Sequence, residues 1–144
     1  MRKLFFLLLL LLFVSGHEIL YAQELCVGEA LYCDMRSGTF SPLFRALRNG
    51  NVEVIKRYIS GDMYRQTRVL LEENKAYPQF LRNFYKGANF SVERAITAED
   101  DIIADVVIEF PHGSKSLTRL RLSKANDQPW KVVSEVKSKH YKSK

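Results

Sequence analysis

The sequence predicts an α+β domain in which three or four helices come first and a four-stranded antiparallel meander sheet follows. Between residues 41 and 85, apolar side chains recur at spacings of three and four, which is the period of an amphipathic helix. From residue 90 to residue 137 they recur at every second position, which is the period of a strand with one buried face. Short polar connections join these runs, so consecutive strands are expected to pair as antiparallel neighbours.

The first 22 residues are interpreted as a secretory signal peptide. Arg2 and Lys3 precede an apolar run over 4–14, which is shorter than the roughly 20 residues that a spanning helix requires. Cleavage is expected after Ala22, with cleavage after Gly16 or a permanent membrane anchor as alternatives. We therefore expect an exported protein, periplasmic or extracellular and soluble after cleavage.

The mature chain has the composition of one basic globular domain. The 144 residues are 47% hydrophobic and 26% charged. Losing Arg2, Lys3 and Glu18 changes 22 basic and 16 acidic side chains to 20 and 15, a formal charge of +5. Residues 138–144 form a basic tail, which would attract anionic surfaces or remain a solvated terminus. Export argues against nucleic acid as a partner.

Residues 23–40 are expected to form a cysteine-containing N-terminal arm. In an oxidising compartment the simplest assignment is a disulfide between Cys26 and Cys33. A straight helix would separate their Cα atoms by roughly 10.5 Å, beyond the roughly 7 Å limit for a bridge, so the segment must bend, and Gly28 is a candidate position. Two separate thiols or an intermolecular pair are the alternatives. No metal site is expected, because the nearby His17 leaves with the signal peptide.

Helix signals begin at residue 41. Ser41 and Pro42 are expected to open the first helix as a cap and a first-turn proline, and the Asn-Gly-Asn stretch 49–51 to end it. A second helix is expected over about 52–60, closed by Gly61. A third begins near Asp62 and loses regularity around residue 74.

Pro78 permits a fourth helical segment, which Gly87 ends. Its apolar positions are largely aromatic and fall at helical spacing: Tyr77, Phe80, Leu81, Phe84 and Tyr85. We interpret this stripe as core and not as a ligand platform, since apolar stripes at helical spacing usually face the core.

The hairpin over 101–122 gives the clearest strand signal. Its two runs flank a turn with Pro111 and Gly113. The buried face is expected to carry Ile102, Ala104, Val106, Ile108 and Phe110 from the first run, and Thr118, Leu120 and Leu122 from the second. In the preceding strand Phe90, Val92 and Ile96 are expected to share one face with Arg94, and in the last strand Trp130, Val132 and Val136 are expected to share one.

The order of these elements resembles the nuclear transport factor two-like superfamily, a cystatin-like α+β cone found in many small exported bacterial domains. The segment LFRALRNGNVEVIKRYIS over 43–60 is similar to the opening helix pair of that family, and QPWKVVSEV over 128–136 to its last strand. The resemblance covers residues 41–137. It implies that the helices pack in the concave face of a curved sheet and leave an apolar pocket between them.

The lining of such a pocket would come from the inward faces of the sheet and helices. The candidates are Phe90, Val106, Ile108, Leu120, Trp130 and Val132 from the sheet and Tyr58, Tyr77 and Phe84 from the helices. The alternative is a filled core, because a domain of this size also needs these side chains to exclude water.

No residue is predicted to be catalytic and no cofactor is expected. Enzymes that the family includes, such as ketosteroid isomerase, hold an aspartate base inside the apolar pocket. Here Asp105 and Glu109 fall on the strand face opposite the apolar one. An exported, non-catalytic binding or interaction module is therefore the first hypothesis, with an isomerase or dehydratase as the alternative.

The outer face of the sheet is a second candidate interaction surface. It is expected to carry the charged residues Asp105, Glu109, Arg119, Arg121 and Lys131. A small apolar molecule or a protein, a second copy of the chain on this face, and an anionic envelope surface are the partners considered. A solvated face with cross-strand ion pairs is the alternative.

Overall fold

The structure is a computed structural model that describes residues 30–126 and 128–137. The predicted signal peptide, Cys26 and the basic tail lie outside these residues, so the disulfide stays a prediction, although Cys33 is not a free cysteine. The helices are α2 (Ala30–Met35), the π-helical turn η1 (Arg36–Phe40), α3 (Ser41–Asn49), α4 (Val52–Tyr58), α5 (Gly61–Glu72) and α6 (Tyr77–Phe84), and the strands are β1 (Asn89–Ala98), β2 (Asp101–Glu109), β3 (Lys115–Ser123) and β4 (Lys131–Glu135).

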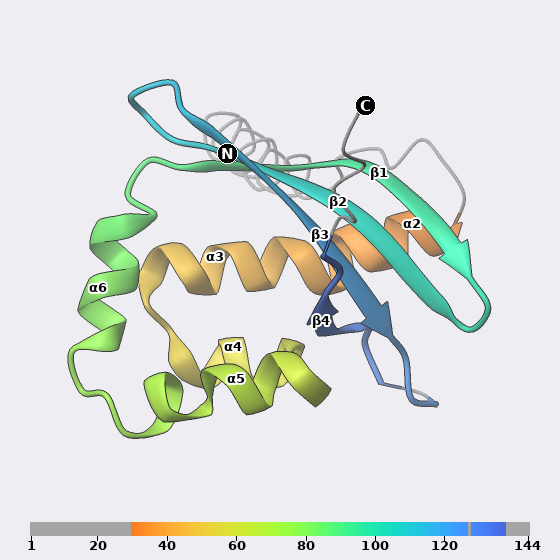
Figure 1. Cartoon of the computed structure of the whole chain (residues 1–144), viewed down its shortest axis with the longest axis horizontal. Helices are drawn as coiled ribbons and strands as arrows, with labels where there is room; N and C mark the ends of the chain where they lie inside the picture. The colour runs from red at the N-terminus through yellow and green to blue at the C-terminus, as the bar shows by residue number, and fades with distance from the viewer. Residues whose placement is uncertain (1–29, 127, 138–144) are drawn as a thin grey trace, which may run out of the picture.

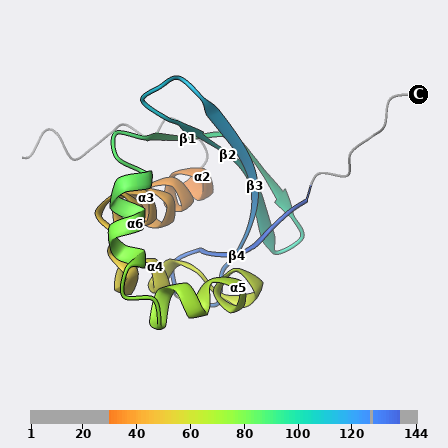
Figure 2. The same cartoon turned by 60° about the vertical axis from the view of Figure 1, so that its left-hand side comes forward.

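The four strands form one antiparallel sheet in the order β1-β2-β3-β4, which confirms the predicted meander. The sheet curves over α3, while α4 and α5 lie on the far side of the interior and pack against β4 (Figures 1 and 2). Helix α6 packs against α3 and closes one end. The fold is therefore an α+β cone with its helices in the concave face of the sheet.

The first helical region runs without a break from Ala30 to Asn49. Ser41 was predicted as a cap, but it has helical dihedrals and its N–H donates to the carbonyl of Arg36, five residues back. Pro42 explains the wide turn, because it has no N–H and its ring would clash with the carbonyl four residues earlier in a regular helix. The cap prediction is therefore wrong.

The Asn-Gly-Asn stretch ends α3 as predicted. Gly50 has a φ of 61°, and the Asn51 side chain caps α4 by accepting a hydrogen bond from the Val54 N–H at 3.2 Å. Gly50 also meets α6, since a Cβ placed on it would lie 2.2 Å from the carbonyl oxygen of Pro78. Glycine at this position allows α3 and α6 to approach closely.

Gly61 was predicted to close α4, but it begins α5. The chain is already extended at Ile59, which forms a parallel bridge with Val132, and the Ser60 N–H donates to the Val132 carbonyl at 2.9 Å. The pairing to β4 ends α4 two residues early. A local helix pattern carries no information about a partner strand more than 70 residues away.

A bulge in β1 reverses its predicted faces. Val92 pairs with Val106, but the next registered pair is Arg94 with Asp105, so Glu93 is extra. Arg94 therefore lies on the outer face, Ala95 faces the core, and Ile96 is 48% exposed. The prediction that Arg94 and Ile96 share the apolar face is wrong because regular alternation cannot anticipate an inserted residue.

A second irregularity changes the alternation in β4. Leu122 pairs with Val132, whereas Arg121 pairs with Ser134 and Leu120 with Glu135. Val133 is the extra residue. Val136 therefore does not continue the face of Val132, contrary to the prediction.

The hairpin faces are as predicted. Ile102, Ala104, Val106 and Leu122 are buried in the core, together with residues of α3, α4 and α6. The core also reaches into the predicted arm, where Met35, Thr39 and Phe40 are buried and the Thr39 hydroxyl donates to the carbonyl of Trp130 at 2.7 Å.

Candidate functional site: an apolar cavity and a charged sheet face

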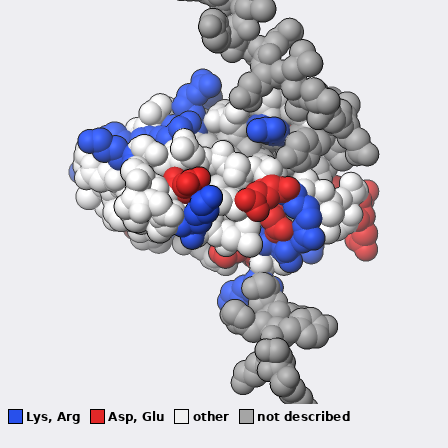
Figure 3. Space-filling view, turned by 90° about the horizontal axis from the view of Figure 1, so that it is seen from above, with Lys and Arg blue, Asp and Glu red and all other residues white. Residues whose placement is uncertain are grey.

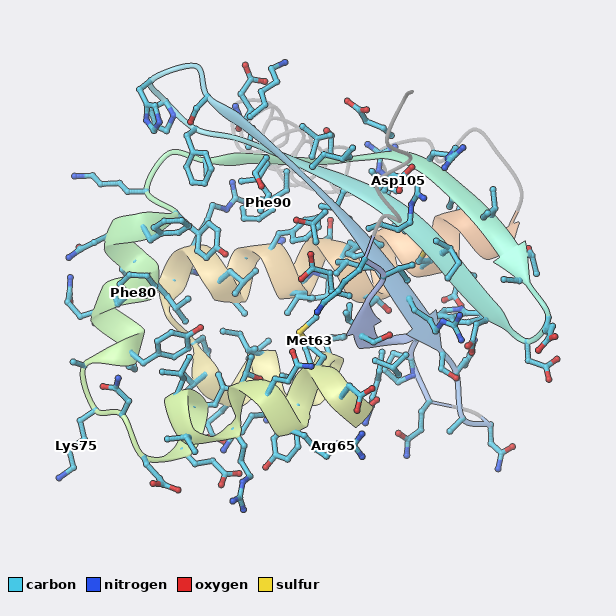
Figure 4. The ribbon with its side chains drawn as sticks, in the orientation of Figure 1. Met63, Arg65, Lys75, Phe80, Phe90 and Asp105 are labelled. Carbon is cyan, nitrogen blue, oxygen red and sulfur yellow. The ribbon has the colours of Figure 1, made fainter. Side chains whose placement is uncertain are left out.

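A cavity of about 240 Å³ lies between the helices and the concave face of the sheet. Helices α3, α4, α5 and α6 and all four strands contribute to it, and Met63 points into it from α5 (Figure 4). Its lining is Leu43, Phe44, Leu47, Ile55, Ile59, Met63, Thr67, Leu71, Tyr77, Tyr85, Phe90, Val106, Ile108, Thr118, Leu120 and Val132. Among these residues only the threonines and tyrosines carry polar side-chain groups.

The cavity has a closed floor and a more open side. The floor is made by buried residues such as Ile55, Leu71 and Val132. The half-buried residues, which include Met63 and Thr118, face each other across the space between α5 and the sheet. The strand residues on this side face inward but are incompletely covered by the helices.

Two of the four polar residues in the lining are tyrosines, Tyr77 of α6 and Tyr85, which directly follows it. Burial raises the pKa of Tyr77, and burial together with the nearby Tyr77 raises the pKa of Tyr85. Both phenols are therefore protonated at neutral pH and can donate a hydrogen bond. The Thr67 hydroxyl is already used, because it donates to the Met63 carbonyl at 2.7 Å.

The structure places six of the nine predicted lining candidates in this cavity: Tyr77, Phe90, Val106, Ile108, Leu120 and Val132. The other three lie elsewhere. Phe84 is 49% exposed on the far side of α6, stacked on Phe80. Trp130 is buried in the core beside Thr39, and Tyr58 packs against the core at the end of α4. Helical spacing groups residues on a face but does not say which neighbour that face meets.

The sequence pattern did not predict that α5 lines the cavity. Met63, Thr67 and Leu71 are four residues apart and project from one side of the helix into the cavity. The spacing of Met63 and Leu71 could have indicated this face, but the polar Thr67 between them obscured it.

Asp105 lies at the centre of an ion-pair network on the outer face of the sheet (Figure 4). The Arg119 Nε donates to its Oδ1 at 2.6 Å, and the Nη2 to its Oδ2 at 3.1 Å, while the Arg94 Nε donates to its Oδ2 at 3.0 Å. Asp105 is only 9% exposed. The hydrogen bonds from Arg119, aided by both positive charges, hold the pKa of the Asp105 carboxyl below its ordinary value.

The other predicted residues of this face are also mostly paired. Glu109 lies 3.5 Å from Lys115, and Arg121 lies 3.5 Å from Asp101. Acidic and basic side chains stand next to one another when the molecule is seen from above (Figure 3). Lys131 stands opposite Ser123 in the backbone register of β3 and β4, which is not an ion pair. The face is therefore a set of neutralising cross-strand pairs and not a continuous basic patch.

Replacing Asp105 by asparagine should lower the free energy of unfolding by about 1–3 kcal/mol at pH 7, because two arginines lose their carboxylate. The folded-state pKa is depressed, so this stabilisation is present above the ordinary value of 3.8 and is lost as the pH falls below it. Urea unfolding at pH 7 and pH 3 measures the effect. The difference between the wild type and Asp105→Asn should shrink at pH 3, and a difference independent of pH would contradict the assignment. Asp101→Asn, at a single 3.5 Å contact, is the matched control.

A second, more polar hollow of about 210 Å³ adjoins the cavity. Phe44 and Phe90, whose rings stack at 4.3 Å, line both spaces. The polar residues of the second hollow are Arg36, Ser41, Arg48, Asn89 and Ser91. The stacked rings thus form a wall between an apolar and a cationic space.

Two other kinds of site were sought in the described part of the chain. No helix there has the length and hydrophobicity to cross a membrane. No group of three histidine, cysteine or acidic side chains there is arranged to hold a metal ion.

Comparisons with known proteins give a likeness of fold. No family model and no curated protein matches the sequence. Among solved structures, the chain is similar to one described as an NTF2-like transpeptidase from Campylobacter jejuni, with 15% identity, a TM-score of 0.47, and coverage of 66% of this chain and 94% of that one. The transpeptidase name belongs to that protein, and nothing about the activity of this chain follows from it.

Proposed function

We propose that this protein is an exported, non-catalytic binding module that holds a small apolar molecule in the cone cavity. The observation that carries the proposal is the cavity itself, about 240 Å³ of space with an almost wholly apolar lining. Ligand sites are typically concave, apolar and furnished with a few polar groups that orient the ligand. The predicted signal peptide is the basis for placing this activity outside the cytoplasm.

The size of the cavity limits the class of ligand. An apolar cavity of about 150 Å³ accepts benzene, whereas pockets for drug-sized ligands are about 300–1,000 Å³. A volume of about 240 Å³ therefore suits a single substituted ring or a short branched hydrocarbon. A polar substituent on such a ligand would be placed best beside Tyr77 and Tyr85.

The isomerase or dehydratase alternative receives less support from the lining. Proton abstraction needs a general base, and the described lining residues include no carboxylate, imidazole or amine. The two tyrosines, with their raised pKa values, are hydrogen-bond donors at neutral pH. This donor set favours orientation of a bound molecule over acid–base chemistry.

Toluene is a suitable probe, because it is slightly larger than benzene and apolar. At ten times its dissociation constant it should stabilise the folded protein by about 1.4 kcal/mol, a rise in melting temperature of about 5 °C. Thr118→Phe, which fills the cavity from its half-buried side, should abolish the rise. Leu117→Phe, on the opposite face of the same strand, should preserve it. No rise in the wild type, or an equal rise in Thr118→Phe, would contradict the proposal.

A further inference from the structure

Helix α6 carries two large aromatic side chains on the protein surface. Phe80 is 53% exposed and Phe84 is 49% exposed, and their rings stack with centroids 5.5 Å apart. The stack continues to Tyr77 on one side, at 5.9 Å, and meets Phe110 edge-on at 5.4 Å on the other. An exposed cluster of this kind marks a surface that meets an apolar environment.

The same surface carries positive charge that the described residues do not neutralise. The segment 75–87 contains Lys75, Arg82 and Lys86 and no acidic residue. None of the three forms an ion pair within residues 30–126 and 128–137. Arg82 is two residues from both Phe80 and Phe84, so it lies on the other side of the helix, where it donates to the Gln79 side chain at 2.8 Å and to the Asn49 carbonyl at 3.4 Å. The two lysines are therefore the cations nearest the aromatic pair in sequence that remain available to it.

Lys75 and Lys86 flank the aromatic stack in the sequence. Lys75 lies two residues before the start of α6 and Lys86 two residues after its end, so one lysine flanks each end of the helix. Lys75 and Phe80 both lie at the end of the molecule that α6 forms (Figure 4). This contrasts with the outer face of the sheet, where most of the cations have an acidic partner.

We propose that the α6 surface, defined by Lys75, Phe80, Phe84 and Lys86, docks on an anionic lipid bilayer. Aromatic rings partition into the interfacial region of membranes, and each nearby lysine or arginine adds attraction to anionic head groups. Helix α6 has eight residues, so it lies along the interface and does not cross it. The two phenyl rings enter the region between head groups and acyl chains while the two lysines contact lipid phosphates.

Docking through this surface also orients the cavity. Tyr77 belongs to α6 and lines the cavity, so the helix that meets the bilayer also borders the proposed ligand site. The membrane inference does not depend on the cavity, because it rests on the exposure and charge of residues outside the lining.

Co-sedimentation with vesicles tests the inference, using exported and processed protein. Binding is expected to vesicles of phosphatidylglycerol and phosphatidylcholine, to be far weaker with phosphatidylcholine alone, and to fall as salt screens the cations. Phe80→Ser/Phe84→Ser should weaken binding by roughly tenfold or more, because two apolar rings are lost from the interface. Lys75→Gln/Lys86→Gln should weaken it by roughly tenfold at low salt.

Matched controls separate this surface from the others. Leu117→Ser removes an apolar side chain that is 64% exposed on the sheet, and it should bind as the wild type does. Deletion of residues 138–144 should also leave binding largely intact. Wild-type melting temperatures for the α6 variants would show that they fold, which is expected for substitutions of half-exposed residues.

The depth of insertion provides an independent readout. The only native tryptophan, Trp130, is buried, so a new tryptophan gives a distinguishable signal. Phe80→Trp should be quenched by brominated acyl chains, and Leu117→Trp should not. Absence of vesicle binding, binding unchanged in Phe80→Ser/Phe84→Ser, or binding that disappears only with the tail deletion would each overturn the inference.

Discussion

Replacing Gly50 by alanine should destabilise the protein by about 3 kcal/mol or more. A left-handed backbone costs a non-glycine residue roughly 1–2 kcal/mol, and Gly50 has a φ of 61°. The new methyl group would also lie 2.2 Å from the backbone oxygen of Pro78, so α3 and α6 would have to separate. Chemical denaturation of purified protein measures the loss.

Gly113→Ala is the matched control for this prediction. Gly113 also has a positive φ, of 86°, but nothing lies within 4 Å of a Cβ placed on it. It should therefore show only the backbone cost of roughly 1–2 kcal/mol. Equal losses at the two glycines would mean that the close approach of α3 and α6 contributes nothing to stability.

Leu122→Ala should lower the free energy of unfolding by about 2–5 kcal/mol. Leu122 is fully buried on the inner face of β3, between Ile102 of β2 and Val132 of β4. Truncating it leaves a void on the inner face of the sheet between β2 and β4, and the pairing on both sides prevents the neighbours from closing it. Urea unfolding measures the loss. If the slope of the unfolding free energy against urea concentration is unchanged, the substitution has altered stability alone.

The opposite face of the same strand supplies the control. Leu117→Ala removes an equal volume, but from a side chain that is 64% exposed. Its effect should stay within about 0.5 kcal/mol. A larger loss for Leu117→Ala than for Leu122→Ala would contradict the assignment of the two hairpin faces.

The strands of the hairpin could be predicted from the sequence, because their alternation continues over about nine residues without interruption. The core positions Ile102, Ala104 and Val106 follow directly from this period. The helix break at Gly50 could also be predicted from the sequence, because Asn-Gly-Asn is a local signal whose geometry needs no tertiary partner.

The errors arise where distant parts of the chain decide the local structure. Glu93 is inserted in β1, so Arg94 reaches Asp105 on the outer face and not the core. Gly61 begins a helix because Ile59 pairs with β4. Neither contact can be inferred from a period, because each depends on the register of a partner strand.

The candidate cavity was only partly predictable for the same reason. Phe84 and Tyr77 share the aromatic pattern of one helix, yet Tyr77 lines the cavity and Phe84 faces outward. The packing of α6 against α3, with Leu81 buried between them and the core, decides which side faces which neighbour. The outward aromatics Phe80 and Phe84, which helical spacing predicts to be core, are the basis of the proposed membrane surface.

Methyl NMR of protein labelled at methionine tests the cavity proposal most directly. Met63 lines the cavity, whereas Met35 is fully buried outside the described lining and reports any global change. Titration with toluene should shift the Met63 methyl resonance saturably and leave that of Met35 in place. Saturating toluene that moves neither resonance, or moves both alike, would contradict binding in the cone cavity.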